Sequence, residues 1–93
     1  MTNLVSPSQI ERIVFAGRDE SCGIRVDDDY ASKIHARFVQ LTDGSVFVED
    51  CGSVNGTYVN EVQVYVPTPV RPGDVVRIGK TVLPWLTPSR PGA

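Results

Sequence analysis

The segment HARFVQLTDGSVFVE (residues 35–49) contains two runs rich in β-branched and aromatic residues, separated by Thr42-Asp43-Gly44. Residues of these types are enriched in strands. A glycine in the short connection supplies the positive φ that a tight turn requires. The segment therefore predicts a β-hairpin whose strands run from His35 to Leu41 and from Ser45 to Glu49.

Similar short runs lie on both sides of this hairpin, and each is followed by turn-forming residues. Arg71-Pro72-Gly73-Asp74 has Pro second and Gly third, the pattern of a type II turn. No pattern indicates a helix longer than one turn. The chain therefore predicts an all-β fold, a two-sheet antiparallel β-sandwich. The further predicted strands are Arg12 to Phe15, Gly23 to Val26, Thr57 to Val59, Gln63 to Val66, Val75 to Ile78 and Thr81 to Leu83.

Composition limits the size of the fold and the classes of partner. With 93 residues, 41% hydrophobic and 22% charged, the chain fits one domain, expected at residues 9–86 between flexible ends at 1–8 and 87–93. A formal net charge of -2 argues against general affinity for nucleic acid or anionic membranes. No apolar run approaches the roughly 18 residues of a membrane span, so we expect a cytoplasmic protein.

Potential metal ligands occur without the spacing of a metal site. Cys22 and Cys51 lack a C-x-x-C pattern, and we expect buried free thiols without a disulfide or zinc. The acidic run Asp27 to Asp29 lacks the alternating spacing of a calcium loop and is interpreted as a solvated turn. His35 is the single histidine. The sequence therefore predicts no metal and no cofactor.

Three short segments at or beside predicted turns hold an unusual set of polar residues: Gly17-Arg18, Ser32-Lys33-Ile34-His35-Ala36, and Gly52-Ser53-Val54-Asn55-Gly56-Thr57 with Asn60 beyond. Together they resemble the forkhead-associated (FHA) domain family, which has Gly-Arg, Ser-x-x-His and Ser-x-Asn-Gly-Thr-x-x-Asn in this order. The resemblance extends from about Ile13 to Thr81. It implies a sandwich of the FHA/SMAD type. The few residues before Gly17 predict a short first strand, and Pro84 predicts a short last strand.

The side chains in these segments have the chemistry to bind a phosphate dianion. Arg18 offers a planar fork of donors, Ser32 a hydroxyl and Lys33 a mobile ammonium. The backbone amide of Val54 could add a further donor. The resemblance implies that these four residues bind the phosphate of a phosphothreonine peptide.

The resemblance also implies roles for the remaining residues of the three segments. Asn55 would hold the peptide backbone after the phosphothreonine, while Tyr30 and Ser53 are expected to contact peptide residues. Lys80 and Arg77, near the last turn, are expected only to solvate their strands. The residues expected to shape the loops are Gly17, His35, Gly56, Thr57 and Asn60.

Catalysis is not predicted. Ser32 and His35 could suggest a nucleophile and base, but there is no Gly-x-Ser-x-Gly elbow and no acidic residue at an orienting position. We expect a phosphothreonine-binding adaptor that acts downstream of a Ser/Thr protein kinase. The alternative is a phosphate-independent interaction or structural module that uses an edge strand or the Trp85 surface.

Overall fold

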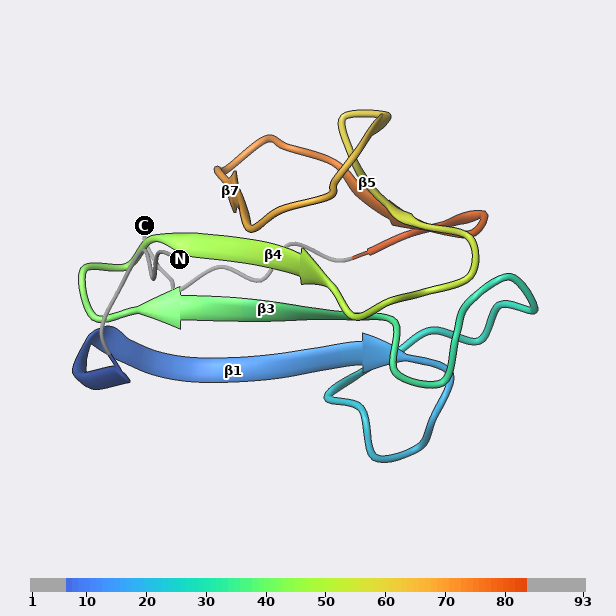
Figure 1. The fold of residues 1–93 in the computed structure, drawn as a ribbon, viewed down its shortest axis with the longest axis horizontal. Helices are drawn as coiled ribbons and strands as arrows, with labels where there is room; N and C mark the ends of the chain where they lie inside the picture. Colours follow the sequence, from blue (N-terminus) through green and yellow to red (C-terminus); the bar gives the residue numbers. More distant parts are fainter. Residues whose placement is uncertain (1–6, 84–93) are drawn as a thin grey trace.

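The computed structural model describes residues 7–83, which form two packed β-sheets (Figure 1). A short 3-10 helix, η1 (Pro7–Gln9), precedes the strands. One sheet has the strand order β2-β1-β3-β4-β7 and the other the order β6-β5-β8-β9. The strands are β1 (Ile10–Gly17), β2 (Ile24–Arg25), β3 (Ala36–Leu41), β4 (Val46–Asp50), β5 (Thr57–Val59), β6 (Val62–Gln63), β7 (Thr68–Val70), β8 (Val76–Ile78) and β9 (Thr81–Val82).

The predicted two-sheet sandwich is confirmed, with one exception in strand direction. Every pairing between the described strands is antiparallel except that of β1 with β2, which is parallel. After β1 ends at Gly17, the chain loops away and returns, so that β2 begins beside Ala16, near the end of β1. This connection brings Arg25 beside Gly17 in the sheet.

The core lies between the sheets and is built from alternate residues of the strands. Phe38 of β3 pairs with Val48 of β4, and both are almost completely buried. Ile78 of β8 is fully buried in the same apolar cluster. Burying side chains of this size is worth roughly 1.5–3 kcal/mol each. The cluster therefore holds the two sheets together below the loops described next.

Both turns predicted from local chemistry are confirmed. The β3–β4 hairpin closes through a hydrogen bond from the Gly44 amide to the Leu41 carbonyl, and Gly44 has a φ of 92°. In the late turn Gly73 has a φ of 95°, and the Asp74 amide donates to the Arg71 carbonyl at 2.9 Å. The positive φ values explain why glycine occupies both positions.

The segment between β5 and β8 differs from the prediction. The strand expected at Gln63 to Val66 ends at Gln63, and the chain pairs again in β7, which was not predicted. β7 was not predicted because it contains Pro69, and proline cannot donate a ladder hydrogen bond. Since β7 is an edge strand, Pro69 is tolerated there opposite Phe47.

Two further expectations need correction. The first strand is not short: β1 has eight residues, whereas the last strand, β9, has two as expected. Both cysteines are free, but only Cys22 is buried and Cys51 is exposed. Residues 1–6, the tail from 87 onward and Trp85 lie outside the described residues. Between residues 7 and 83 no helix is long and apolar enough to cross a membrane.

Candidate functional site

The three predicted segments meet at one end of the sandwich, where β1 and β4 end and β3 begins (Figure 1). The Arg18 amide donates to the Ser32 carbonyl at 3.0 Å. The Val54 amide donates to the Ser32 hydroxyl oxygen at 3.2 Å. Ser32 therefore lies between the Arg18 segment and the β4–β5 loop.

Gly17 permits this close approach. A Cβ atom added at Gly17 would lie 2.1 Å from the backbone oxygen of Lys33, closer than any real contact. The His35 amide also donates to the Ala16 carbonyl at 2.9 Å, which fixes the same two backbones side by side. A side chain at position 17 would therefore push the Ser32-Lys33 segment away from β1.

Two cationic side chains project beside Ser32. The Nε atom of Arg18 donates to the Ala31 carbonyl at 2.8 Å, which orients the guanidinium group. Within residues 7–83 neither its terminal nitrogens nor the Lys33 ammonium has a protein partner. Both residues are exposed. Their donors are therefore available for an anion in solution.

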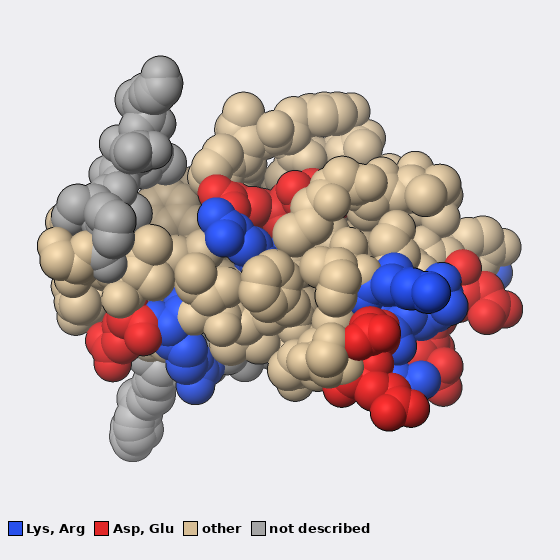
Figure 2. Space-filling model, turned by 60° about the horizontal axis from the view of Figure 1, so that its bottom comes forward, with Lys and Arg blue, Asp and Glu red and all other residues tan. Residues whose placement is uncertain are grey.

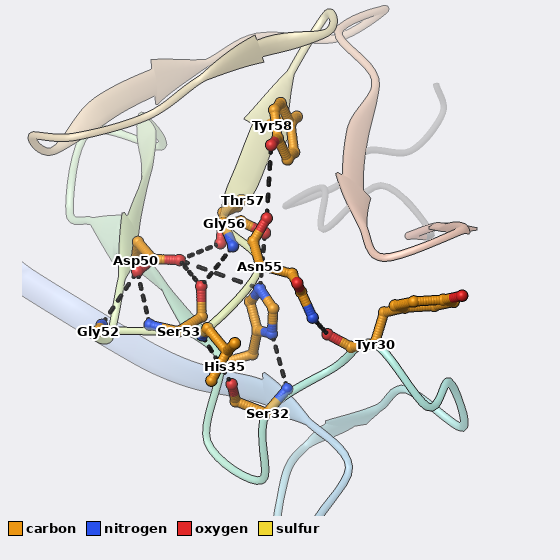
Figure 3. A network of polar contacts seen from close by, with 11 residues as sticks. Tyr30, Ser32, His35, Asp50, Gly52, Ser53, Asn55, Gly56, Thr57 and Tyr58 are labelled. Atoms are coloured by element: carbon orange, nitrogen blue, oxygen red, sulfur yellow. Dashed lines mark hydrogen bonds and ion pairs between the residues drawn. The ribbon is translucent and has the colours of Figure 1, made fainter.

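His35 lies between the loop that contains Ser32 and the β4–β5 loop, and it links them (Figure 3). Its ring is fully buried, and its Nδ1 atom accepts a hydrogen bond from the Ser32 amide at 2.9 Å. Its Nε2 atom lies 2.8 Å from the carbonyl oxygen of Gly56. The neutral ring with hydrogen on Nε2 satisfies both contacts, since Nδ1 must accept and Nε2 must donate. His35 thus fixes the spacing of the loops without reaching the surface.

Asp50, which sequence reasoning did not single out, organises the β4–β5 loop (Figure 3). Its carboxylate accepts hydrogen bonds from the amides of Gly52 and Ser53 and from the hydroxyls of Ser53 and Thr57. Burial raises the pKa of Asp50, but the bonds from Ser53 and Thr57 outweigh it, so the pKa is below its ordinary value. An Asp at a strand end before Gly-Ser was the available signal.

The loop uses some of the groups that were predicted to face a ligand. The Ser53 hydroxyl donates to Asp50 at 2.6 Å and accepts from the Gly56 amide at 2.9 Å. The Val54 side chain is 87% exposed, while its amide is bonded to Ser32. Thr57 is fully buried on Asp50. Ser53 and Val54 therefore both have contacts that hold the loop together.

Asn55 and Asn60 lie in different places. The Asn55 amide nitrogen Nδ2 donates to the Tyr30 carbonyl at 2.8 Å, at the exposed end of the site (Figure 3). Asn60, expected to shape the same loop, instead bonds Asp74 and Val75 at the far turn. Its positive φ of 51° suits the β5–β6 turn, and the expectation for Asn60 is therefore corrected.

A hollow of about 200 Å³ adjoins Asn55, with Tyr30, Tyr58, Arg77 and Lys80 in its wall. The Lys80 ammonium lies 5.2 Å from the centre of the Tyr30 ring, and the Arg77 guanidinium lies 4.4 Å from that of Tyr58. Arg77 is also paired with Glu61 on the surface. Lys80 and Arg77 are therefore placed beside the site, which the sequence did not indicate.

Asp28 holds this wall in place across a wide sequence separation. It accepts bonds from the Tyr30 amide and from the Lys80 amide, at 2.8 and 2.7 Å, and from the Thr81 hydroxyl. The bond from Tyr30, followed by those from Thr81 and Lys80, lowers the pKa of Asp28. The predicted turn is present, since the Ala31 amide donates to the Asp28 carbonyl at 2.9 Å, but the Asp28 side chain is hydrogen-bonded and not merely solvated.

Acid should weaken the fold through Asp50. A carboxyl group whose pKa is lowered on folding contributes stability above its unfolded pKa, near 3.9, and this contribution is lost as the pH falls through the folded value. We expect Asp50→Asn to lower the free energy of unfolding at pH 7 by about 1–3 kcal/mol. The difference in the free energy of unfolding between the wild type and Asp50→Asn should become smaller below about pH 4. Urea melts at pH 7 and pH 3 measure this, with exposed Glu11→Gln as control; an equal loss at both values would contradict it.

Comparison with known proteins agrees with the fold described above. The family model described as "FHA domain" matches residues 14–79. The FHA domain-containing protein FhaB of Mycobacterium tuberculosis is 41% identical over 73 residues, 78% of this chain and 46% of that protein. The chain thus spans about half the length of the curated relatives it matches.

Solved structures with the same fold include the FHA domain of the CT664 protein from Chlamydia trachomatis. It has a TM-score of 0.74 and 29% identity, over 77% of this chain and 73% of that chain. A second, from work on phosphothreonine-dependent FHA domain interactions, has a TM-score of 0.72 and 27% identity, over 78% of this chain and 74% of that one.

Proposed function

The chain belongs to the FHA domain family, and we propose on this basis that it is a phosphothreonine-peptide-binding module that acts as an adaptor and catalyses no reaction. One observation carries the proposal. The donors of Arg18 and Lys33, which have no partner within residues 7–83, line one hollow. The backbone of Arg18 is bonded to Ser32, the neighbour of Lys33, on loops that His35 locks together. This is a fixed cluster of donors on a protein whose net charge is -2. Such a site selects a local, strongly charged anion.

The geometry suggests how a phosphate would be held. The two terminal nitrogens of Arg18 match two phosphate oxygens, because the guanidinium is a planar fork. The Ser32 oxygen already accepts from the Val54 amide, so its own hydrogen is free to be donated. Lys33 adds a flexible charge. We assign Val54 an indirect part, in which its amide orients Ser32 through this bond.

Asn55 would bind the peptide backbone next to the phosphate. Its Nδ2 atom is bonded to Tyr30, which leaves the carbonyl oxygen Oδ1 as an acceptor for a peptide amide. Because Ser53 is engaged by Asp50 and Gly56, we assign it to the loop and not to the peptide. The residues after the phosphothreonine would then pass over the hollow beside Asn55.

Lys80 should favour an acidic residue after the phosphothreonine. Its ammonium faces the Tyr30 ring and forms no salt bridge within residues 7–83, although its charge interacts with Asp28. A peptide carboxylate could therefore pair with it while its methylenes contact the ring. We expect a Glu in this region to raise affinity by about fivefold. Lys80→Ala should remove that gain. Fluorescence anisotropy with paired Glu and Ala peptides tests it, with exposed Arg71→Ala as control; an unchanged gain in Lys80→Ala would exclude this role.

Binding should depend on pH through the ligand. The second pKa of phosphothreonine lies near 6, and the monoanion has less charge to offer Arg18 and Lys33. We therefore expect affinity for one peptide to be several-fold weaker at pH 5 than at pH 7.5. Calorimetric titrations at both values measure the difference. Equal affinities would argue against a site built for the dianion.

In the cell we propose a partner that carries phosphothreonine and a Ser/Thr protein kinase that acts upstream, in the cytoplasm. Because the chain spans about half of its relatives' length, these proposals concern the module and not the activity of a longer protein. Calorimetry with a degenerate phosphothreonine library tests the function. Phosphoserine and unphosphorylated libraries serve as controls. Equal binding of all three would favour the phosphate-independent module instead.

A further inference from the structure

A hollow of about 680 Å³ extends from the phosphate site on the side away from Asn55. Arg18 and Lys33 line it, and so does Arg25, for which no role was predicted. In Figure 2 one of several groups of basic side chains lies at the right-hand end of the molecule, with acidic side chains around it. Arg25 is therefore a third cation in this hollow, besides the two assigned to the phosphate.

Arg25 is held in place in the same manner as Arg18. Its strand, β2, pairs with β1 so that Arg25 lies opposite Gly17. Its Nε atom donates to the Arg18 carbonyl at 3.1 Å, just as the Nε atom of Arg18 donates to Ala31. Within the described residues its terminal nitrogens have no partner. Arg25 thus presents a second oriented guanidinium beside the first.

The acidic residues of the hollow neutralise this cluster only in part. Asp19 accepts from the Ser21 hydroxyl and amide, and these bonds lower its pKa first, before the charges of Lys33 and Arg25. Its carboxylate is therefore turned into its own loop while remaining near both cations. Glu20 is exposed. Three cations thus face two carboxylates in one hollow, so the hollow keeps a net positive charge, and the terminal donors of Arg25 remain open to an anion.

The contacts also indicate on which side of the phosphothreonine Arg25 lies. Arg25 bonds Arg18, Arg18 bonds the Ala31-Ser32 backbone, and Asn55 bonds Tyr30 beyond it. If Asn55 holds the backbone after the phosphothreonine, Arg25 lies on the side of the residues before it. We propose, resting on the proposed function, that Arg25 binds a second anionic group N-terminal to the phosphothreonine, either a carboxylate side chain or a second phosphate.

Peptides with a second anion test this directly. The reference peptide has one phosphothreonine preceded by four alanines, and the series places one Glu, or one phosphothreonine, at each of these four positions. We expect at least one Glu peptide to bind about fivefold more tightly than the reference, and the doubly phosphorylated one more tightly still. A gain confined to the second phosphate would identify phosphate as the source.

The Arg25→Gln variant separates the possible results. It should bind the reference peptide as the wild type does but lose the gain from the second anion, whereas the control Arg12→Gln should keep it. A gain that persists in Arg25→Gln, or no gain at any position, would overturn the inference while leaving phosphothreonine binding intact. Absence of binding to every peptide by the folded wild type would overturn the proposed function and this inference with it.

Discussion

Replacing Arg18 with alanine should weaken phosphothreonine-peptide binding by at least about 100-fold. The side chain offers two terminal nitrogens with no partner among residues 7–83, and hydrogen bonds to charged groups contribute about 1.5–3 kcal/mol each. Lys33→Ala should cost less, about five- to tenfold, because a flexible exposed ammonium gives one bond at most. Calorimetry with one phosphothreonine peptide measures both variants.

Two controls make the Arg18 result interpretable. Arg71 is exposed in the turn that follows β7, so Arg71→Ala removes the same charge without touching the site. Because Arg18 itself is exposed and its side chain bonds only Ala31 in the described part of the chain, Arg18→Ala should melt close to the wild type. A larger loss in Lys33→Ala than in Arg18→Ala would mean that the phosphate lies elsewhere in the loops.

His35→Ala should be the most destabilising change in the site. It removes a fully buried ring that bonds the Ser32 amide and the Gly56 carbonyl, and leaves both groups unpaired beside a cavity. We expect a loss of about 2–4 kcal/mol in the free energy of unfolding. For a domain of this size that corresponds to roughly 10–25 °C in Tm. Urea and thermal melts measure it.

The effect of His35 on binding should follow from its effect on the loops. Where the variant remains folded, phosphopeptide affinity should fall because Ser32 and the β4–β5 loop lose their fixed spacing. His35→Gln is the partial replacement, since its amide can donate to one carbonyl, and it should lie between the alanine variant and the wild type. Thr42→Ala, in the exposed hairpin turn, is the neutral control. A His35→Ala variant as stable as the wild type would contradict the linking role.

The parts of the fold that the sequence predicted are those with local causes. Gly44 and Gly73 mark turns that need a positive φ, and the β3–β4 hairpin follows from its two runs of β-branched and aromatic residues. β7 was missed because Pro69 argues against a strand unless the strand is known to lie at an edge. The parallel pairing of β2 with β1 depends on a crossover that no short window of sequence reveals.

The residues of the site likewise fall into those that the sequence indicates and those that only the folded structure brings into place. Arg18, Ser32 and Lys33 stood out because three separated segments resemble one family, and the structure brings those segments together. Asp28 and Lys80 did not stand out, because their contact spans 52 residues and follows from the packing of two turns. Likewise, the partner of the Val54 amide depends on where the Ser32 hydroxyl lies after folding.

An amide chemical-shift titration of the 15N-labelled chain with a phosphothreonine peptide would locate the phosphate site. We expect the largest shifts at Arg18, Ser32, Lys33, Val54 and Asn55, and no such shifts with the unphosphorylated peptide. Shifts from both peptides alike, or shifts confined to strands away from these loops, would contradict a phosphate site at this end of the sandwich.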